Sequence, residues 1–284
     1  MFDSKKIADH ISHWLKDYAV QCNAKGFVIG ISGGIDSALT STLCAQTGMQ
    51  VLCLEMPIHQ AASQVTRAQE HISWLKAQYA NVKDQRIELT ETFEQLRKSV
   101  DTTGADHTVQ LALANARARL RMTTLYYYAG MHGLLVAGTG NKVEDFGIGF
   151  FTKYGDGGVD LSPIADLTKT EVYTLSTWLG IAESILHAAP TDGLFGDSRT
   201  DEQQIGASYA ELEWAMRLLD SKFQHSDLEW PTATSAKDLQ WADADAPNLT
   251  DRQKEVVKIY IQRHLANRHK MVAVPVCVIP KGWT

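Results

Sequence analysis

Residues 30–37 of the chain read GISGGIDS and follow directly after the apolar run Phe27-Val28-Ile29. The apolar run is typical of a buried strand. A glycine-rich loop between a strand and a helix commonly binds phosphate, because backbone N–H groups can approach an anion closely where Cβ atoms are missing. The familiar phosphate loop carries a lysine, whereas this loop has none and places Asp36 beside the expected anion. A carboxylate at that point requires a counter-charge such as Mg²⁺.

Length and composition favour one large α/β domain over residues 1–284, because 44% of the residues are hydrophobic and can form a substantial core. The net charge of −6 argues against nucleic acid and anionic membrane as partners. The first 18 residues predict an amphipathic helix and no signal peptide, and we expect a cytoplasmic protein. The four cysteines show no CxxC spacing and are interpreted as reduced core residues.

Helix and strand patterns alternate along the chain. Strands are expected at 27–31, 51–54, 86–89 and 133–138, and helices at 1–18, 37–47, 62–79, 108–131 and 251–268. Alternation with continuous apolar strands predicts an α/β fold, with a Rossmann-like parallel β-sheet and helices on both faces. Ligands of such folds bind beyond the carboxyl ends of the strands, where both glycine-rich segments, 30–34 and 138–140, fall. Residues 224–250 are acidic and turn-rich and predict a flexible surface insertion.

The loop at residues 30–37, hereafter the glycine loop, has the donors of an anion site. Backbone N–H groups of its glycines would form a nest, and Ser32 and Ser37 add hydroxyls. The pattern SGGxDS resembles the PP-loop of the N-type ATP pyrophosphatases, which cleave ATP between the α and β phosphates. The resemblance implies that Mg²⁺ binds Asp36, and that ATP contacts Gly30, Ile31, Ser32, Gly33, Gly34, Ile35, Asp36 and Ser37. A serine-capped turn without a ligand is the alternative.

A second segment, residues 138–171, is too dense in glycines, carboxylates and lysines for a packing role alone. With other matches it resembles the NAD synthetase family, whose members turn deamido-NAD into NAD. The matching positions are Gly138-Thr139, Glu144, residues 149–158 with Asp160, Pro163, Leu167, Lys169, Pro190-Thr191, Leu194, residues 115–122, Asp201-Glu202, residues 206–209 and His269-Lys270. They cover nearly the whole chain, so the resemblance is specific.

This resemblance implies an acyl-adenylate mechanism. The nicotinate carboxylate attacks the α-phosphorus of ATP, pyrophosphate leaves, and ammonia then displaces AMP. Asp36 and Glu144 would hold Mg²⁺, and Lys169 would contact the ATP phosphates as a catalytic cation. Thr139 and Thr191 would add hydroxyl contacts to ATP.

The same resemblance assigns the ammonia and deamido-NAD sites. Asp156 would bind ammonium and help to remove its proton, since only neutral ammonia is a nucleophile; a turn aspartate that accepts from backbone N–H groups is the alternative. The implied deamido-NAD-binding residues are Asn115, Arg119, Lys153, Asp160, His269 and Lys270. Arg117, Arg119 and Arg121 alternate along a predicted helix and cannot share one face, so at most one or two of them point at substrate.

Architecture sets the expected nitrogen donor and assembly. The 29 residues before the glycine loop hold one predicted helix and leave no room for a glutaminase domain, so free ammonia is the expected donor. The family resemblance implies a homodimer. The predicted helix 108–131 is apolar around more of its circumference than a one-sided surface helix needs, and its tyrosines and methionines favour an interface. Burial under the chain's own later helices is the alternative.

Two rival functions share part of this pattern. Another PP-loop adenylating amidotransferase, or a tRNA-modifying enzyme, would keep SGGxDS but would not need the 138–171 segment. A non-catalytic nucleotide-binding module could share the sheet, yet it has no use for Asp36, Glu144, Asp156 and Lys169 together. The sequence therefore predicts an ammonia-dependent ligase of NAD biosynthesis.

Overall fold

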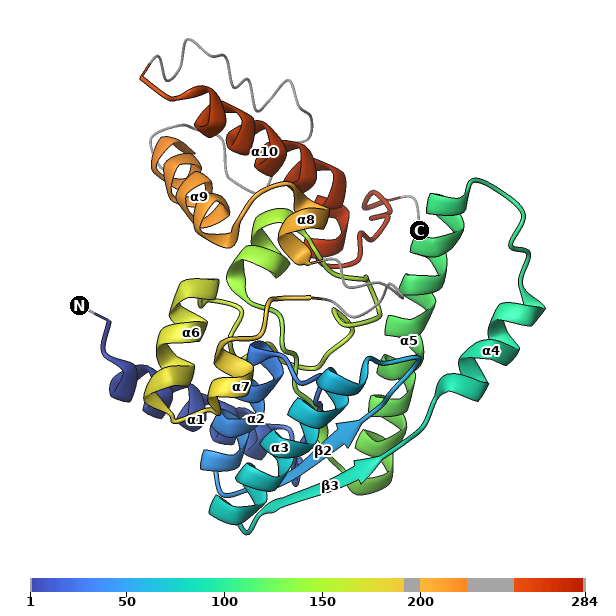
Figure 1. Cartoon of the computed structure of the whole chain (residues 1–284), viewed down its shortest axis with the longest axis vertical. Coiled ribbons are helices and arrows are strands. Elements are labelled where there is room, and N and C mark those ends of the chain that lie inside the picture. The colour runs from blue at the N-terminus through green and yellow to red at the C-terminus, as the bar shows by residue number, and fades with distance from the viewer. Residues whose placement is uncertain (1, 192–199, 224–247, 283–284) are drawn as a thin grey trace.

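The computed structural model describes residues 2–191, 200–223 and 248–282 (Figure 1). The helices are α1 (Ser4–Gln21), α2 (Ile35–Gln46), α3 (Ala62–Gln78), α4 (Thr90–Ser99), α5 (Asp106–His132), the π-helical turn η1 (Val143–Ile148), α6 (Lys169–Trp178), α7 (Glu183–Leu186), α8 (Asp201–Ile205), α9 (Tyr209–Phe223) and α10 (Asp251–Met271); the strands are β1 (Gly26–Gly30), β2 (Gln50–Glu55), β3 (Val82–Arg86) and β4 (Leu135–Val136). Most of the predicted insertion, residues 224–247, lies outside the described residues.

The strands form a parallel sheet in the order β3-β2-β1-β4 within the described part of the chain. Side chains alternate across it: Phe27 and Ile29 of β1 pack with α1, α2, α3 and α6, whereas Val28 packs with α4 and α5 on the opposite face. Burial on both faces explains why β1 reads as a continuous apolar run. The predicted α/β fold with helices on both faces is confirmed.

Helices η1, α8, α9 and α10 form a second hydrophobic cluster beyond the carboxyl ends of the strands, above the sheet in Figure 1. Val143 and Ile148 of η1 are fully buried in it, so the apolar residues of this turn anchor it to the cluster. A capping box of Thr250 and Gln253 begins α10. In this arrangement η1 lies between the other helices of the cluster and the ends of the strands.

Two predictions, the position of the third strand and the burial of all four cysteines, are wrong. The third strand is Val82–Arg86 and not 86–89, because an edge strand tolerates charged side chains, while Leu89 packs with α4 after the strand has ended. The four cysteines are not all core residues: Cys44 and Cys53 are buried, but Cys22 and Cys277 are exposed. No helix among the described residues is long and apolar enough to cross a membrane.

His71 of α3 is a buried titratable group away from the strand ends. Its ring is fully buried, lies 2.9 Å from Ser41 Oγ through Nε2, and stacks on Trp74. Burial lowers the pKa of His71 to about 4. The unfolded chain, with a histidine pKa near 6.5, therefore binds more protons than the folded chain between these two pH values.

We predict that the free energy of unfolding falls as the pH drops from about 6.5 to about 4, by about 3 kcal/mol from this residue. His71→Gln keeps an N–H for Ser41 but does not titrate, so its denaturant midpoint should lose this part of the acid dependence. His187→Gln, at an exposed histidine paired with Glu183, is the control and should leave it unchanged. Equal acid slopes in His71→Gln and the wild type would contradict the assignment.

Candidate active site

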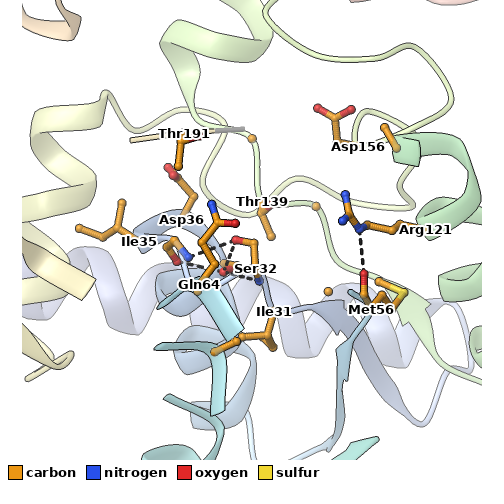
Figure 2. A pocket seen from close by; sticks show the side chains of 18 of the residues that line it. Ile31, Ser32, Ile35, Asp36, Met56, Gln64, Arg121, Thr139, Asp156 and Thr191 are labelled. Atoms are coloured by element: carbon orange, nitrogen blue, oxygen red, sulfur yellow. Dashed lines mark hydrogen bonds between the residues drawn. The ribbon is translucent and has the colours of Figure 1, made fainter. Parts of the chain in front are cut away.

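A cavity of about 270 Å³ opens at the carboxyl ends of the strands (Figure 2). Its walls come from the glycine loop, the end of β2, α5, residues 137–140, η1, the loop after η1 and the start of α6. In Figure 2 Ser32 and Asp36 lie on one side, and Arg121 and Asp156 on the other. This is the position at which parallel α/β sheets bind ligands.

The glycine loop is held in its conformation by its own serines. Ser37 Oγ donates to Gly34 O at 2.9 Å, and Ser32 Oγ accepts from Gly34 N at 3.2 Å. Gly33 has φ +80°, and a Cβ there would lie 2.4 Å from Gln64 O, so this position requires glycine. This pre-formed loop and the N-terminus of α2 line the cavity, the position at which a helix N-terminus can bind an anion.

Lys169 lies between two carboxylates that come from distant segments. Its Nζ donates to Asp36 Oδ2 at 2.7 Å and to Glu144 Oε1 at 3.0 Å, and the side chain is almost fully buried. Burial alone would lower the pKa of Lys169, but Asp36 and then Glu144 outweigh it and raise the pKa. The lysine is therefore an ammonium at the centre of the cavity wall.

Asn141 connects these carboxylates to the backbone of η1. Its Oδ1 accepts from Val143 N and Glu144 N, which caps the start of the turn, and its Nδ2 donates to Asp36 Oδ1 at 3.1 Å. The side chain is fully buried. One asparagine thus orients Glu144 and Asp36 together, and a π-helical turn at this point agrees with the frequent occurrence of such turns at functional sites.

Two further carboxyls lie on the cavity wall. Asp156 Oδ1 accepts from Thr152 N at 2.9 Å, and burial raises the pKa of Asp156. Burial, followed by Glu144 and Asp156, raises the pKa of Asp145 to about 8, so this carboxyl is mostly protonated at pH 7. The protonation of Asp145 reduces the negative charge that Lys169 alone would have to balance.

The donor set suits a divalent cation that arrives with phosphate. Asp36 and Glu144 converge on one ammonium, so their oxygens lie within reach of a single cation. The described residues contain no cluster of three or more His, Cys, Asp or Glu side chains with metal-binding geometry. Mg²⁺ commonly takes one or two protein carboxylates and completes its shell with water and substrate phosphates, and these two residues fit that mode.

The structure brings together the residues predicted for ATP and metal. Every one of them lines the cavity: residues 30–37, Thr139, Glu144, Lys169 and Thr191, together with Asp156. The six predicted deamido-NAD residues do not line it. They are Asn115, Arg119, Lys153, Asp160, His269 and Lys270.

Five of those six residues instead make hydrogen bonds that connect α5, residues 149–153 and the end of α10. Arg119 donates to Lys153 O, Lys153 Nζ donates to His269 O at 2.8 Å, and Lys270 Nζ donates to Gly149 O. Asn115 Oδ1 accepts from Thr152 Oγ1 at 2.7 Å. The end of α10 is therefore tied to the loop after η1, next to the cavity.

Asp160 has a separate environment. Its Oδ2 accepts from Val136 N at 2.8 Å and its Oδ1 accepts from Tyr126 Oη at 3.0 Å. This carboxylate joins β4 to α5.

The comparisons with known proteins agree with this geometry. The family model described as NAD synthase matches residues 7–244. The chain belongs to the NAD synthase family. It is 38% identical to the NH(3)-dependent NAD(+) synthetase of Carboxydothermus hydrogenoformans, over 72% of this chain and 82% of that protein, and 35% identical to that of Methanosarcina mazei, over 84% and 91%.

A solved structure is also similar over the whole length. The NMN synthetase of Francisella tularensis superposes with a TM-score of 0.77 at 29% identity, and the match covers 99% of this chain and 100% of that one.

Sequence reasoning missed several residues of this NAD synthase family site. Arg121 lines the cavity and donates to Met56 O and Gln60 Oε1. Arg117 lies over the Phe93 ring, and Arg119 donates to Lys153 O. The prediction that the three arginines do not share one face is confirmed. Asn141 could be recognised only from contacts between segments distant in sequence. Arg121 and Tyr209 lie in the matched runs 115–122 and 206–209 but were given no role.

We predict that Asp36→Asn folds but loses affinity for the metal. Asn141 cannot flip, since its Oδ1 caps η1, so an asparagine at 36 must face either Asn141 Nδ2 or Lys169 with its own amide donor. That mismatch should reduce stability by about 1–3 kcal/mol, within the reserve of a typical domain. Loss of a carboxylate ligand should lower the Mg²⁺-dependent rate by about a hundredfold or more.

Thermal unfolding and Mn²⁺ binding in the presence of a non-hydrolysable ATP analogue are the two measurements for Asp36→Asn. Asp166→Asn is a matched control, because Asp166 pairs with Lys142 at an exposed site. Near-normal turnover of Asp36→Asn at low Mg²⁺ would remove Asp36 from the metal site.

Proposed function

We propose that the chain amidates deamido-NAD with ammonia and ATP to give NAD, AMP and pyrophosphate. The observation that carries the proposal is the joint presence, in one cavity, of a lysine-free phosphate loop and two carboxylates that share one cation position. The curated relatives described above are named NH(3)-dependent NAD(+) synthetases, and the chain covers most of their length. They support ammonia as the nitrogen donor.

The first half-reaction is the activation of a carboxylate. An oxygen of the nicotinate carboxylate forms a bond to the α-phosphorus of ATP, and the bond from that phosphorus to the bridging oxygen of the β-phosphate breaks. The glycine loop and Lys169 neutralise charge on the departing pyrophosphate, while Thr139 and Thr191 orient the nucleotide. Asp36 and Glu144 would hold Mg²⁺, which would neutralise phosphate charge as a Lewis acid.

The second half-reaction replaces AMP by nitrogen. Ammonia attacks the acyl carbon, the bond from that carbon to the phosphate oxygen breaks, and nitrogen loses a proton. Asp156 lies on the cavity wall with a raised pKa, which makes its carboxylate a better proton acceptor than an aspartate with an ordinary pKa. We assign it the binding of ammonium and the removal of the proton.

A second acceptor follows from the structural neighbour named NMN synthetase. An enzyme that forms NMN by amidation needs nicotinate mononucleotide, which is deamido-NAD without its AMP half. Both acceptors present the same reacting carboxylate to the cavity. They differ only in the AMP half. We propose that this half contacts the six residues outside the cavity, which form the acceptor site: Asn115, Arg119, Lys153, Asp160, His269 and Lys270.

We predict that AMP and pyrophosphate, and not ADP and phosphate, form in step with NAD when deamido-NAD, ATP, Mg²⁺ and ammonium are supplied. Glutamine should give no product above contaminating ammonium, and the rate should rise with pH as the fraction of neutral ammonia grows. Chromatography of the nucleotide products is the direct measurement. Detection of ADP, or efficient use of glutamine by the purified chain, would refute the reaction class or the donor.

The same assay with nicotinate mononucleotide decides between the two acceptors. We expect a higher kcat/KM for deamido-NAD, because its AMP half adds binding contacts. A higher kcat/KM for nicotinate mononucleotide would assign the chain to the activity for which its structural neighbour is named.

The chain also has a surface suited to a second copy of itself. One face of α5 packs on the sheet, but Tyr127 and Met131, one turn apart on another face, are 61% and 63% exposed. Tyrosine and methionine are enriched at protein interfaces. Tyr126, beside them, donates to Asp160, so this surface adjoins a residue of the proposed acceptor site. The proposed assembly is a homodimer through α5.

Tyr127→Glu should convert the dimer to a monomer and weaken deamido-NAD binding, with less effect on ATP binding at the glycine loop. A charge introduced on a desolvated apolar surface opposes association strongly. Sedimentation velocity at micromolar concentration gives the mass. Val20→Glu, at an exposed apolar residue of α1, is the control for adding a surface charge; a fully active wild-type monomer would rule the dimer out.

A further inference from the structure

One sequence motif has no role in the mechanism above. It consists of Asp201 and the run Gly206-Ala207-Ser208-Tyr209, which spans α8 and the start of α9. Gly206 ends α8 with φ +89°, a left-handed conformation that glycine adopts without strain. The chain then turns and begins α9 at Tyr209.

The position of Tyr209 is fixed by the turn that precedes it. Ser208 N donates to Glu211 Oε2 and Glu211 N donates to Ser208 Oγ, which is the reciprocal pair of a capping box. Arg252 of α10 donates to both oxygens of Glu211 and to Gly206 O. The backbone of Tyr209 is therefore anchored to α10 from outside the site.

The side chain of Tyr209 points toward the metal carboxylates. Its hydroxyl lies 2.5 Å from Glu144 Oε1 and 3.0 Å from Asp201 Oδ2. Tyr209 and Asp201 are 6% and 5% exposed. The ring also faces Lys169, whose Nζ is 4.7 Å from the ring centroid. Tyr209 thus contacts both Glu144 and the cation that Glu144 shares with Asp36.

This geometry restricts Glu144. A buried carboxylate with a single hydrogen-bond donor can rotate about its terminal torsion, which is broad, whereas donors on two sides hold it in one orientation. Lys169 approaches Glu144 Oε1 from α6, and Tyr209 approaches the same oxygen from α9. When Lys169 contacts phosphate instead, Tyr209 is the contact that remains.

We propose that Tyr209 is a positioning residue for the metal ligand Glu144, to which its hydroxyl donates its proton at the shorter of its two contacts. The inference rests on the proposed function only in taking Glu144 as a metal ligand. Hydrogen-bond partners of metal ligands commonly alter metal affinity by 10–100-fold when they are removed. Tyr209 acts through Glu144 and contacts no reacting atom.

Tyr209→Phe is the test, because it removes the hydroxyl and keeps the ring over Lys169. Mn²⁺ binding in the presence of a non-hydrolysable ATP analogue, followed by electron paramagnetic resonance, should weaken about tenfold or more. The KM for Mg²⁺ in turnover should rise, while the KM for the acceptor should change little. Tyr260→Phe is the control: Tyr260 is buried in the same cluster, and its variant should lose stability without a change in Mn²⁺ affinity.

A double-mutant cycle separates positioning from packing. In a Glu144→Ala background, Tyr209→Phe should have no further effect on Mn²⁺ affinity, because its effect runs through Glu144. An equal loss in both backgrounds, or wild-type Mn²⁺ affinity in folded Tyr209→Phe, would overturn the proposal. Metal and nucleotide binding are measured without acceptor or ammonia, so a wrong assignment of the acceptor would leave this result intact.

Discussion

The site depends on one electrostatic constraint: two partly buried carboxylates from distant segments must share a cation. Asp36 lies in the first turn of α2 and Glu144 lies in η1, yet both accept from the Lys169 ammonium. Like charges this close repel strongly in a medium of low dielectric. Removing one partner of a buried ion pair commonly costs about 3–5 kcal/mol, because an uncompensated charge remains. Lys169 therefore stabilises the ligand-free site.

The surrounding contacts follow from the need to hold this charge cluster in place. The Thr168 capping box fixes the start of α6 and hence the backbone of Lys169. Asn141 fixes Asp36 and the first N–H groups of η1, and Tyr209 reaches Glu144 from α9. Four segments of the chain thus meet at one cation position. The second hydrophobic cluster is needed because η1 and α9 must be packed rigidly for these short contacts to persist.

Local patterns in the sequence predicted the parts of this site that depend on local geometry. The glycine loop and the flanking strand and helix arise from neighbouring residues, and the structure has them as expected. The edge strand β3 was misplaced because its charged residues lack an apolar pattern. Asn141 was missed for a different reason: it works through a partner many residues away, and no local pattern marks such a contact. Arg121 and Tyr209 lie in runs that match the family, but their roles depend on partners distant in sequence.

The residues proposed as the acceptor site lie next to a second set of contacts, between α10 and the end of η1. His264 Nδ1, Asn267 Nδ2 and Lys270 Nζ lie on one face of α10 and contact the carbonyl oxygens of residues 147, 148 and 149 in turn. Carbonyl groups at the end of a helical turn have no partner within it, so α10 supplies these partners.

Two lysines that the family resemblance assigns to deamido-NAD donate hydrogen bonds to neutral carbonyl groups in this structure. Lys153 donates to His269 O and Lys270 donates to Gly149 O and Phe151 O. A phosphate oxygen carries negative charge whereas a carbonyl oxygen is neutral, so a pyrophosphate attracts an ammonium more strongly than a carbonyl does wherever it can reach these side chains. The carbonyl contacts of the free chain therefore hold the loop together without preventing the lysines from binding an anionic acceptor.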